Sequence, residues 1–302
     1  GMDGIDQGKR ARAQMACFPR IKPYRDEMEN KFQWCIAGVP GVKWAQKVFP
    51  GLPEAEAVEK LWEAILNAAR ANGDPIANWE QHNEIIHRRC DELNSKGFVE
   101  LRYRSSNGTD FKVGLMKQGI FAGGAEKDLS GRVFNPNIPS EEIFTTPERG
   151  KAEGLLVATK PLSWQGTLIE DFSIRFENGR AVEVKAARGH EALERMIAMD
   201  ENAAFLGECA LISWDSPINN TGILFYNTLF DENACCHLAL GRGFDNCVKD
   251  YEKYTQDELH KMGVNDSMIH VDFMIGSEDL DITGIAADGS ETAIFRNGVW
   301  CF

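Results

Sequence analysis

The stretch Phe98-Val-Glu-Leu-Arg-Tyr-Arg-Ser-Ser-Asn-Gly-Thr-Asp-Phe-Lys-Val-Gly-Leu115 decides the fold class. Apolar and polar side chains alternate on both sides of Asn107-Gly108, which is the pattern of strands with one buried face. An Asn-Gly pair between two alternating runs favours a turn. The stretch therefore predicts two antiparallel strands, and the same pattern predicts a tighter hairpin over residues 172–184, around Asn178-Gly179.

The sequence ahead of Phe98 has the period of helices instead. Residues 54–71 carry one apolar stripe at helical spacing, formed by Val58, Leu61, Trp62, Ile65, Leu66 and Ala69. A second helix is expected from Asn78, with Gln81 completing a capping box, to about Leu93. His82 and His87 lie on this helix five residues apart, so we do not expect them to bind one ligand together.

Helices followed by strands are typical of the α+β class. We therefore expect an α+β fold in two parts. Residues 1–97 are predicted to form a mostly helical partial lobe, which packs on an antiparallel-sheet-rich, barrel-like domain formed by residues 98–302.

Composition excludes several classes of partner. The 302 residues carry a net charge of −13, which argues against nucleic acid and against an anionic membrane surface. No apolar run approaches the ~18 residues of a spanning helix, and no apolar segment follows Lys9, Arg10 and Arg12 as it would in a signal peptide. The eight cysteines contain no CxxC pair and are expected to be reduced thiols, so the predicted location is cytoplasmic.

Two predicted strands carry charged residues among apolar ones. In Ile269-His-Val-Asp-Phe-Met-Ile-Gly276, His270 and Asp272 are two residues apart and therefore share one face of a strand. Glu208 is the only charge in the apolar segment from Ala204 to Trp214. Burying a charged or polar side chain costs free energy unless another group stabilises it. A metal ion would stabilise His270 and Asp272, and either a metal ion or a salt bridge would stabilise Glu208.

Two further acidic motifs fit ordinary structural roles at least as well as a metal site. Glu141-Glu142 follows Ser140, which can cap a helical turn, and acidic residues suit a first turn. Asp231-Glu232 is also typical of a helix start, which would place His237 in a small apolar helix as an ordinary core residue. Taken together, however, the four segments supply the carboxylates and imidazoles that a pair of divalent ions prefers.

Several of these motifs together resemble the M29 family of metallo-aminopeptidases, the thermophilic aminopeptidase family. They are Asn135-Pro-Asn-Ile-Pro-Ser-Glu-Glu-Ile-Phe-Thr-Thr-Pro147, Leu206-Gly-Glu-Cys-Ala-Leu-Ile212, Thr228-Leu-Phe-Asp-Glu-Asn-Ala234, His237-Leu-Ala-Leu-Gly241 and Ser267-Met-Ile-His-Val-Asp-Phe-Met-Ile-Gly276. The resemblance extends from about residue 30 to the end of the chain. It implies an aminopeptidase that removes amino-terminal residues from peptides with a water activated by two metal ions.

The resemblance also implies roles for particular residues. Two divalent ions, zinc, cobalt or manganese, are expected on Glu142, Glu208, His237, His270 and Asp272, with Glu208 as the bridge. Glu232 matches a further acidic position close to the metals and is expected among the metal-site residues. By analogy with other two-metal peptidases, Glu141 is expected to be the general base, since that base precedes a ligand carboxylate. Members of the family tend to form homodimers.

The chain departs from the family pattern at two points. First, Phe244 stands where the family often has a tyrosine, seven residues after the histidine ligand. Second, the family usually carries an amino-terminal α/β lobe, which this sequence is expected to lack in large part. A phenylalanine cannot donate a hydrogen bond to a tetrahedral intermediate, so Arg242, Tyr251 or Tyr254 would have to do so. Two other functions therefore stay open: a metal-binding protein with weak or no peptidase activity, and an amidohydrolase for other amides.

Overall fold

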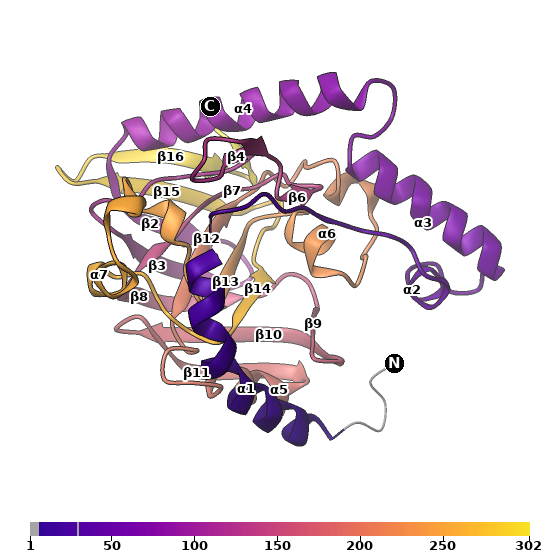
Figure 1. Ribbon diagram of the computed structural model, residues 1–302, viewed down its shortest axis with the longest axis horizontal. Coiled ribbons are helices and arrows are strands. Elements are labelled where there is room, and N and C mark those ends of the chain that lie inside the picture. The colour runs from indigo at the N-terminus through magenta and orange to yellow at the C-terminus, as the bar shows by residue number, and fades with distance from the viewer. Residues whose placement is uncertain (1–5, 29) are drawn as a thin grey trace.

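The computed structural model describes residues 6–28 and 30–302, which form a large and a small β-sheet with helices around them (Figure 1). The large sheet has nine strands, with β9 paired to β10 beside the main path β11-β10-β8-β3-β2-β15-β16-β17. Its strands are β2 (Phe98–Arg104), β3 (Asp110–Leu115), β8 (Pro147–Val157), β9 (Leu162–Trp164), β10 (Thr167–Glu177), β11 (Arg180–Arg188), β15 (Asp281–Ala286), β16 (Glu291–Arg296) and β17 (Val299–Trp300). Every pair in it is antiparallel.

The small sheet has the order β14-β13-β12-β7 and is also antiparallel. Its strands are β7 (Ile143–Thr145), β12 (Leu206–Leu211), β13 (His237–Gly241) and β14 (His270–Met274). In Figure 1 the large sheet runs from β16 at the top to β11 at the bottom, and β12 and β13 lie between these two ends. The large sheet therefore wraps around one face of the small sheet.

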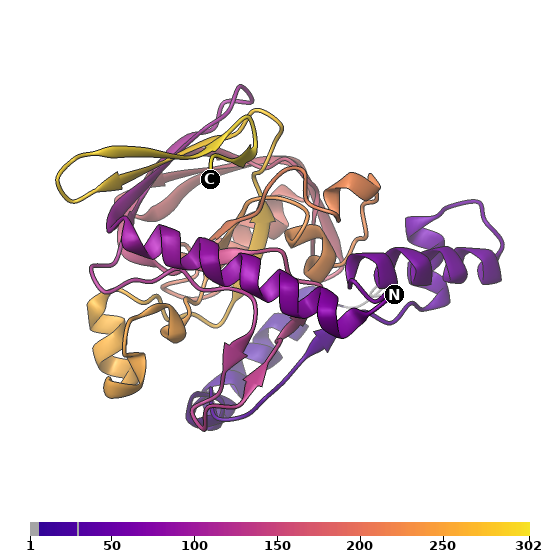
Figure 2. The ribbon, with the colours of Figure 1, turned by 90° about the horizontal axis from the view of Figure 1, so that it is seen from above.

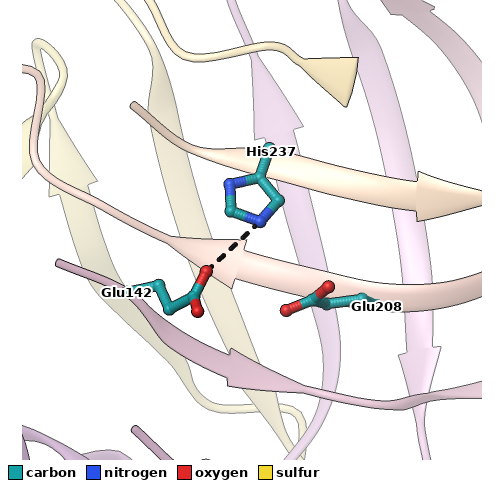
Figure 3. A group of neighbouring side chains, drawn as sticks. All are labelled: Glu142, Glu208 and His237. Atoms are coloured by element: carbon teal, nitrogen blue, oxygen red, sulfur yellow. Dashed lines mark ion pairs between the residues drawn. The ribbon is translucent and has the colours of Figure 1, made fainter. Parts of the chain in front are cut away.

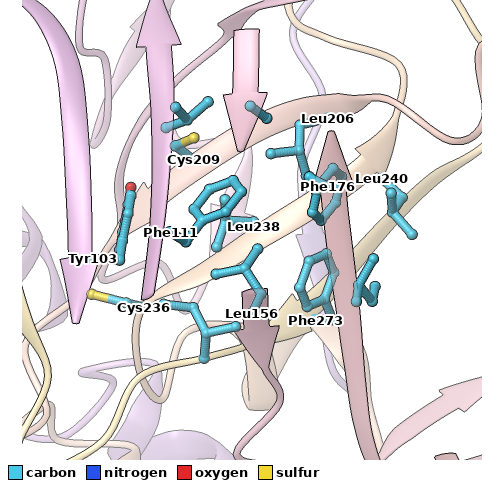
Figure 4. Close-up of a cluster of buried hydrophobic side chains, with 14 of the residues drawn as sticks. Tyr103, Phe111, Leu156, Phe176, Leu206, Cys209, Cys236, Leu238, Leu240 and Phe273 are labelled. Carbon is cyan, nitrogen blue, oxygen red and sulfur yellow. The ribbon is translucent and has the colours of Figure 1, made fainter. Parts of the chain in front are cut away.

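The main core fills the space between the two sheets (Figure 4). Phe111 and Phe176 reach it from the large sheet, and Leu238, Leu240 and Phe273 reach it from the small one. Since side chains alternate along a strand, the residues between these apolar ones must point to the opposite face of the small sheet. That opposite face carries the charged residues.

The helices lie outside the sheets. Helix α4 (Pro75–Ser95) packs Ile86, Cys90 and Leu93 into the main core. Helices α2 (Val42–Val48) and α3 (Glu54–Ala68) project to one side (Figures 1 and 2) and share a second core with α6 (Thr228–Glu232). The remaining helices are α1 (Gln7–Met28), α5 (His190–Ile197), α7 (Gln256–Met262) and three short 3₁₀ turns at residues 219–221, 245–247 and 251–253.

An extended segment crosses the molecule between α1 and α2. It pairs β1 (Ile36–Ala37) in parallel with β6 (Asn137–Ile138), directly ahead of the Glu141-Glu142 motif. Beside it lies a short hairpin of β4 (Glu126–Lys127) and β5 (Val133–Phe134). Among the described residues no helix is long and apolar enough to cross a membrane.

The predicted α+β class is confirmed, as are the hairpins at Asn107-Gly108 and Asn178-Gly179. The second helix begins three residues earlier than expected, because Asp74 caps it and Pro75 takes its first turn. Val99 is 41% exposed although the alternation placed it inside, because the ladder between β2 and β15 shifts register there. The division at residue 97 stays a prediction.

Two local expectations were wrong. His237 lies on strand β13, because helix α6 begins at Thr228 and already ends at Glu232. Ser140 caps no helix, and residues 141–142 form an irregular link between β6 and β7. The acidic residues in both segments therefore have no first-turn role of the expected kind, apart from Asp231, whose carboxylate accepts hydrogen bonds from the backbone of Phe225 and Asn227.

Candidate metal centre

The outer face of the small sheet gathers the charged residues predicted from the sequence. His270 and Asp272 share this face of β14, because Val271 and Phe273 point into the main core. Glu208 takes the same face of β12, where Cys209 and Leu211 point inward, and His237 begins β13. Glu142 immediately precedes β7. Residues up to 130 positions apart in sequence thus meet through strand alternation on β13 and β14, a register shift between Leu206 and Glu208 on β12, and the link ahead of β7.

A small residue at the centre of the sheet leaves room between the carboxylates. Ala239 is the cross-strand partner of Glu208 on one side and of Asp272 on the other. Any larger side chain at Ala239 would occupy the space into which both carboxylates point. Gly241 faces His270 in the next row, with φ of 102° and no room for a Cβ beside the Ile269 carbonyl.

The ligand atoms form two groups that share one residue. Glu142, Glu208 and His237 offer atoms within 4.8 Å of one another, and so do Glu208, His270 and Asp272. Nε2 of His237 lies 3.5 Å from Oε2 of Glu142, and Nε2 of His270 lies 3.1 Å from both Glu208 Oε2 and Asp272 Oδ1. Figure 3 shows Glu142 and His237 pointing toward each other beside Glu208. Glu208 therefore has the position of a bridging ligand.

Backbone carbonyls fix the orientation of both imidazoles. Nδ1 of His237 lies 2.9 Å from the Glu232 carbonyl, and Nδ1 of His270 lies 2.7 Å from the Arg242 carbonyl. In each case Nδ1–H donates to the carbonyl, so Nε2 faces the carboxylates and is the nitrogen that a metal ion would bind. A histidine that binds a metal through one nitrogen is commonly held this way through the other.

The electrostatics of this face call for a cation. Burial raises the pKa of Glu142 well above its ordinary value, and the neighbouring Glu208 and Asp272 raise it further. Burial likewise raises the pKa of Glu232, with Asp272 and Glu142 as its main charged neighbours. Burial opposes protonation of His270, but Asp272 and Glu208 outweigh it and hold that pKa well above its ordinary value. Positive charge from a proton or from a metal ion stabilises this cluster.

The donor set fits divalent metal ions. Within the described chain, Nε2 of His237 is buried and has no hydrogen-bond partner, although buried polar atoms in proteins usually have one. Oδ1 of Asp272 is also buried, and Nε2 of His270 lies 3.1 Å from it. Both atoms belong to the two ligand groups. Three carboxylates and two neutral imidazoles supply the mixture of oxygen and nitrogen ligands that zinc and neighbouring transition metals accept.

A cavity of about 820 Å³ opens onto the cluster. Four aromatic side chains line it: Phe144 and Phe244 beside the cluster, and Phe32 and Trp34 from the extended segment before β1. The Phe244 ring is tilted against the His270 ring, with 4.8 Å between ring centroids, and lies edge-on to Phe144 at 5.3 Å. Arg242 and Glu232 also line it. Arg242, Tyr251 and Tyr254 are the candidate hydrogen-bond donors in place of the family tyrosine. Of these three, only Arg242 is among the described residues that line the cavity.

Sequence reasoning missed one acidic residue of this cavity. Glu126, on the two-residue strand β4, lines the cavity, and burial raises its pKa to about 7. Its carboxylate accepts a hydrogen bond from the Asn246 amide at 3.4 Å. A strand of two residues has no periodicity, so no sequence pattern distinguishes Glu126 from a surface glutamate.

Glu141 points elsewhere. Its carboxylate makes a two-point ion pair with the guanidinium of Arg70, with 2.8 Å between Nη2 and Oε2. Within the described chain it is not among the residues that line the cavity, whereas Glu142 is. Its assignment as general base stays a prediction. His82, for which no ligand shared with His87 is expected, is buried and contacts the backbone beside this pair.

Comparison with known proteins agrees with the geometry. The chain is 43% identical to aminopeptidase AmpS of Bacillus subtilis and 44% identical to aminopeptidase T of Thermus thermophilus, over 100% and 99% of its length and 74% and 73% of theirs. The solved structure of wild-type AmpT from Thermus thermophilus superimposes with a TM-score of 0.89 at 43% identity, over 100% of this chain and 73% of that one. A dioxygenase acting on 2,5-dihydroxypyridine, from Pseudomonas putida, shares the fold alone, at 16% identity and a TM-score of 0.50.

The family comparison covers nearly the whole chain. The model of the thermophilic metalloproteases (M29) matches residues 1–300, including all the segments that meet on the outer face of the small sheet. The relatives match over the same length and at more than 40% identity. On these grounds the chain belongs to the M29 family of metalloproteases.

Proposed function

We propose that this protein is an aminopeptidase that removes amino-terminal residues from peptides with the help of two divalent metal ions. The observation that carries the proposal is the pair of ligand groups that share Glu208. Glu142 and His237 would hold one ion, and His270 and Asp272 the other. The names of the relatives support the activity, since both are aminopeptidases.

The metal ions would lower the pKa of a bound water and polarise the scissile carbonyl. The remaining steps fall to the protein. Glu232 lines the cavity beside Asp272 and offers a carboxylate to the free amino group of the substrate. The rings of Phe144 and Phe244 would form an apolar wall beside the reacting bond. A carboxylate must carry the proton of the attacking water to the leaving amine. The analogy with other two-metal peptidases predicts Glu141 for this step, whereas in the structure its carboxylate pairs with Arg70 and is not among the groups that line the cavity.

The proposal includes details that the sequence suggested. The metal is expected to be zinc, cobalt or manganese, the location cytoplasmic and the assembly a homodimer. Residues 98–302 would form the metal-binding domain, with residues 1–97 as a partial lobe. Elemental analysis of purified protein, cell fractionation and light scattering test the first three of these points.

Hydrolysis of aminoacyl anilides tests the activity. Metal content is measured first, and turnover of leucine p-nitroanilide is then followed with and without added cobalt or zinc. We expect metal-dependent turnover that is lost when the substrate amino group is acetylated, because an aminopeptidase needs that group free. Bound metal with no turnover of any aminoacyl substrate would refute the proposal.

One observation favours a second function, a metal-binding protein with little peptidase activity. The ring of Phe244 lies against that of His270 and offers no hydroxyl beside the cluster. Loss of one hydrogen-bond donor to a tetrahedral intermediate typically lowers turnover ~10²–10³-fold. Full metal occupancy combined with turnover at least that far below a tyrosine-containing relative would support this second function.

A further inference from the structure

The irregular link ahead of the ligand Glu142 is held at three points by residues from other elements. The Ser140 carbonyl lies 2.7 Å from Nε2 of His82, the backbone N–H of Glu141 donates to Oδ1 of Asn233 at 2.7 Å, and the Glu141 carboxylate pairs with Arg70. These contacts come from α4, from the end of α6 and from the turn between α3 and α4. Strand pairing holds Glu142 only on its other side, where β7 begins.

The groups that hold the link are themselves well fixed. Asn233 is fully buried and its amide donates to the Leu229 carbonyl at 2.9 Å. Burial lowers the pKa of His82, so its ring is neutral at pH 7 and donates through Nε2–H. The ring packs edge-on against Trp79, which donates from its indole to the Ala69 carbonyl at 2.8 Å.

Arg70 has an unusual backbone conformation for its residue type. Its φ is 53°, in the left-handed region, where a residue with a Cβ is disfavoured by about 1 kcal/mol or more. Its carbonyl accepts from the Asn78 side chain at 3.1 Å, and its guanidinium lies 6.0 Å from the centre of the Trp79 ring. The turn is thereby shaped so that both guanidinium nitrogens reach Glu141.

We infer that Arg70 and Glu141 form a positioning pair that holds Glu142 in its metal-binding geometry. The inference rests on the proposed metal centre. Glu141 then serves the adjacent ligand through the backbone, with its own carboxylate committed to Arg70, and the helical part of the chain contributes to the metal centre through this pair. The side-chain burial of the pair, with 20% of Arg70 and 8% of Glu141 exposed, makes it far less screened than a surface pair.

Metal affinity is the appropriate measurement, because it does not depend on turnover. Partners that orient a metal ligand typically contribute 10–100-fold to affinity. We expect Arg70→Gln and Glu141→Gln each to weaken zinc binding about 10-fold or more, measured by competition with a chromophoric chelator. The double variant should bind zinc no more weakly than the weaker single variant, since one pair is lost in all three. Arg70→Lys should restore part of the affinity.

The control is Arg175→Gln, which removes an exposed pair with Glu183 on the large sheet and should leave zinc affinity within twofold of the wild type. Thermal unfolding of every variant identifies loss of fold. Should Arg70→Gln fail to fold, Glu141→Gln and Arg70→Lys decide the question. Zinc affinity within twofold of the wild type in these variants would overturn the inference.

Turnover at saturating zinc separates positioning from general-base chemistry. A positioning pair predicts that kcat largely recovers in Glu141→Gln once the site is full. A loss of ~100-fold or more that persists in Glu141→Gln, but not in Arg70→Gln, would assign the base to Glu141 and overturn the inference. If the wild type binds zinc but turns over no aminoacyl substrate, the proposed function fails, and the affinities still decide the positioning role.

Discussion

Replacing Glu126 by glutamine should stabilise the metal-free protein above neutral pH. Burial raises the pKa of this carboxyl from 4.5 to about 7 in the folded state. The folded protein therefore binds the proton more tightly than the unfolded chain does, and stability falls as pH rises from about 4.5 to about 7. A difference of about 2.5 pKa units corresponds to at most about 3 kcal/mol, lost in full above pH 7.

Glutamine has nearly the same shape and stays neutral, so it avoids this loss while keeping an acceptor for the Asn246 amide. The free energy of unfolding is measured in urea with a chelator present, at pH 4, 6 and 8. The variant should equal the wild type at pH 4 and exceed it by up to about 3 kcal/mol at pH 8. The matched control is Glu177→Gln, which removes the same charge from an exposed position on β10 and should show no such pH dependence.

A gain that is the same at every pH would refute this reasoning, because it would reflect net charge or packing in place of a shifted pKa. A gain shared equally by Glu177→Gln would have the same meaning. In the wild type with zinc added, the pH dependence should become smaller, because a bound cation favours the ionised form of every nearby carboxyl.

Four other substitutions test the metal centre itself. Glu208→Ala should abolish binding of both ions, since Glu208 belongs to both ligand groups, whereas Asp272→Ala should leave one; metal analysis after gel filtration distinguishes the two results. Ala239→Val should weaken zinc binding at least tenfold in a chelator competition, because the new methyl groups enter the space between Glu208 and Asp272. Phe244→Tyr should raise kcat on leucine p-nitroanilide by about 10-fold or more, and an unchanged kcat would show that this position supplies no hydrogen bond to the reaction.

The sequence predicts those parts of the fold that depend on local pattern. Alternation over residues 98–115 and 172–184 predicts the hairpins correctly, because one face of each strand is buried. The same rule places His270 and Asp272 on a common face, as the structure has them. Resemblance to the M29 motifs adds Glu142 and His237, whose local patterns alone are typical of a helix start and of a helical core residue.

The rest depends on contacts between distant segments. Arg70 lies 71 positions from Glu141, in a turn that nothing in its own sequence distinguishes. Glu126 gains its shifted pKa only because β4 is placed against the cavity. His237 was predicted in a helix because Asp231-Glu232 is an acceptable helix start, and the pairing of β13 with strands on both sides outweighed that local preference.

The acidic face of the small sheet explains why a metal centre and a rigid scaffold occur together here. Five carboxyl groups line one cavity beside two imidazoles: Glu126, Glu142, Glu208, Glu232 and Asp272. Without a cation they repel one another, and a flexible segment would relieve that repulsion by moving apart. Glu208 and Asp272 lie on strands bonded to their neighbours, and Glu142 follows a link held from three directions. The scaffold therefore keeps the carboxylates close together, and their repulsion is relieved only when a cation binds. Binding raises the stability of the folded protein by RT ln(1 + [M]/Kd), where [M] is the concentration of free metal ion. At a hundredfold excess of metal over Kd this amounts to about 2.7 kcal/mol.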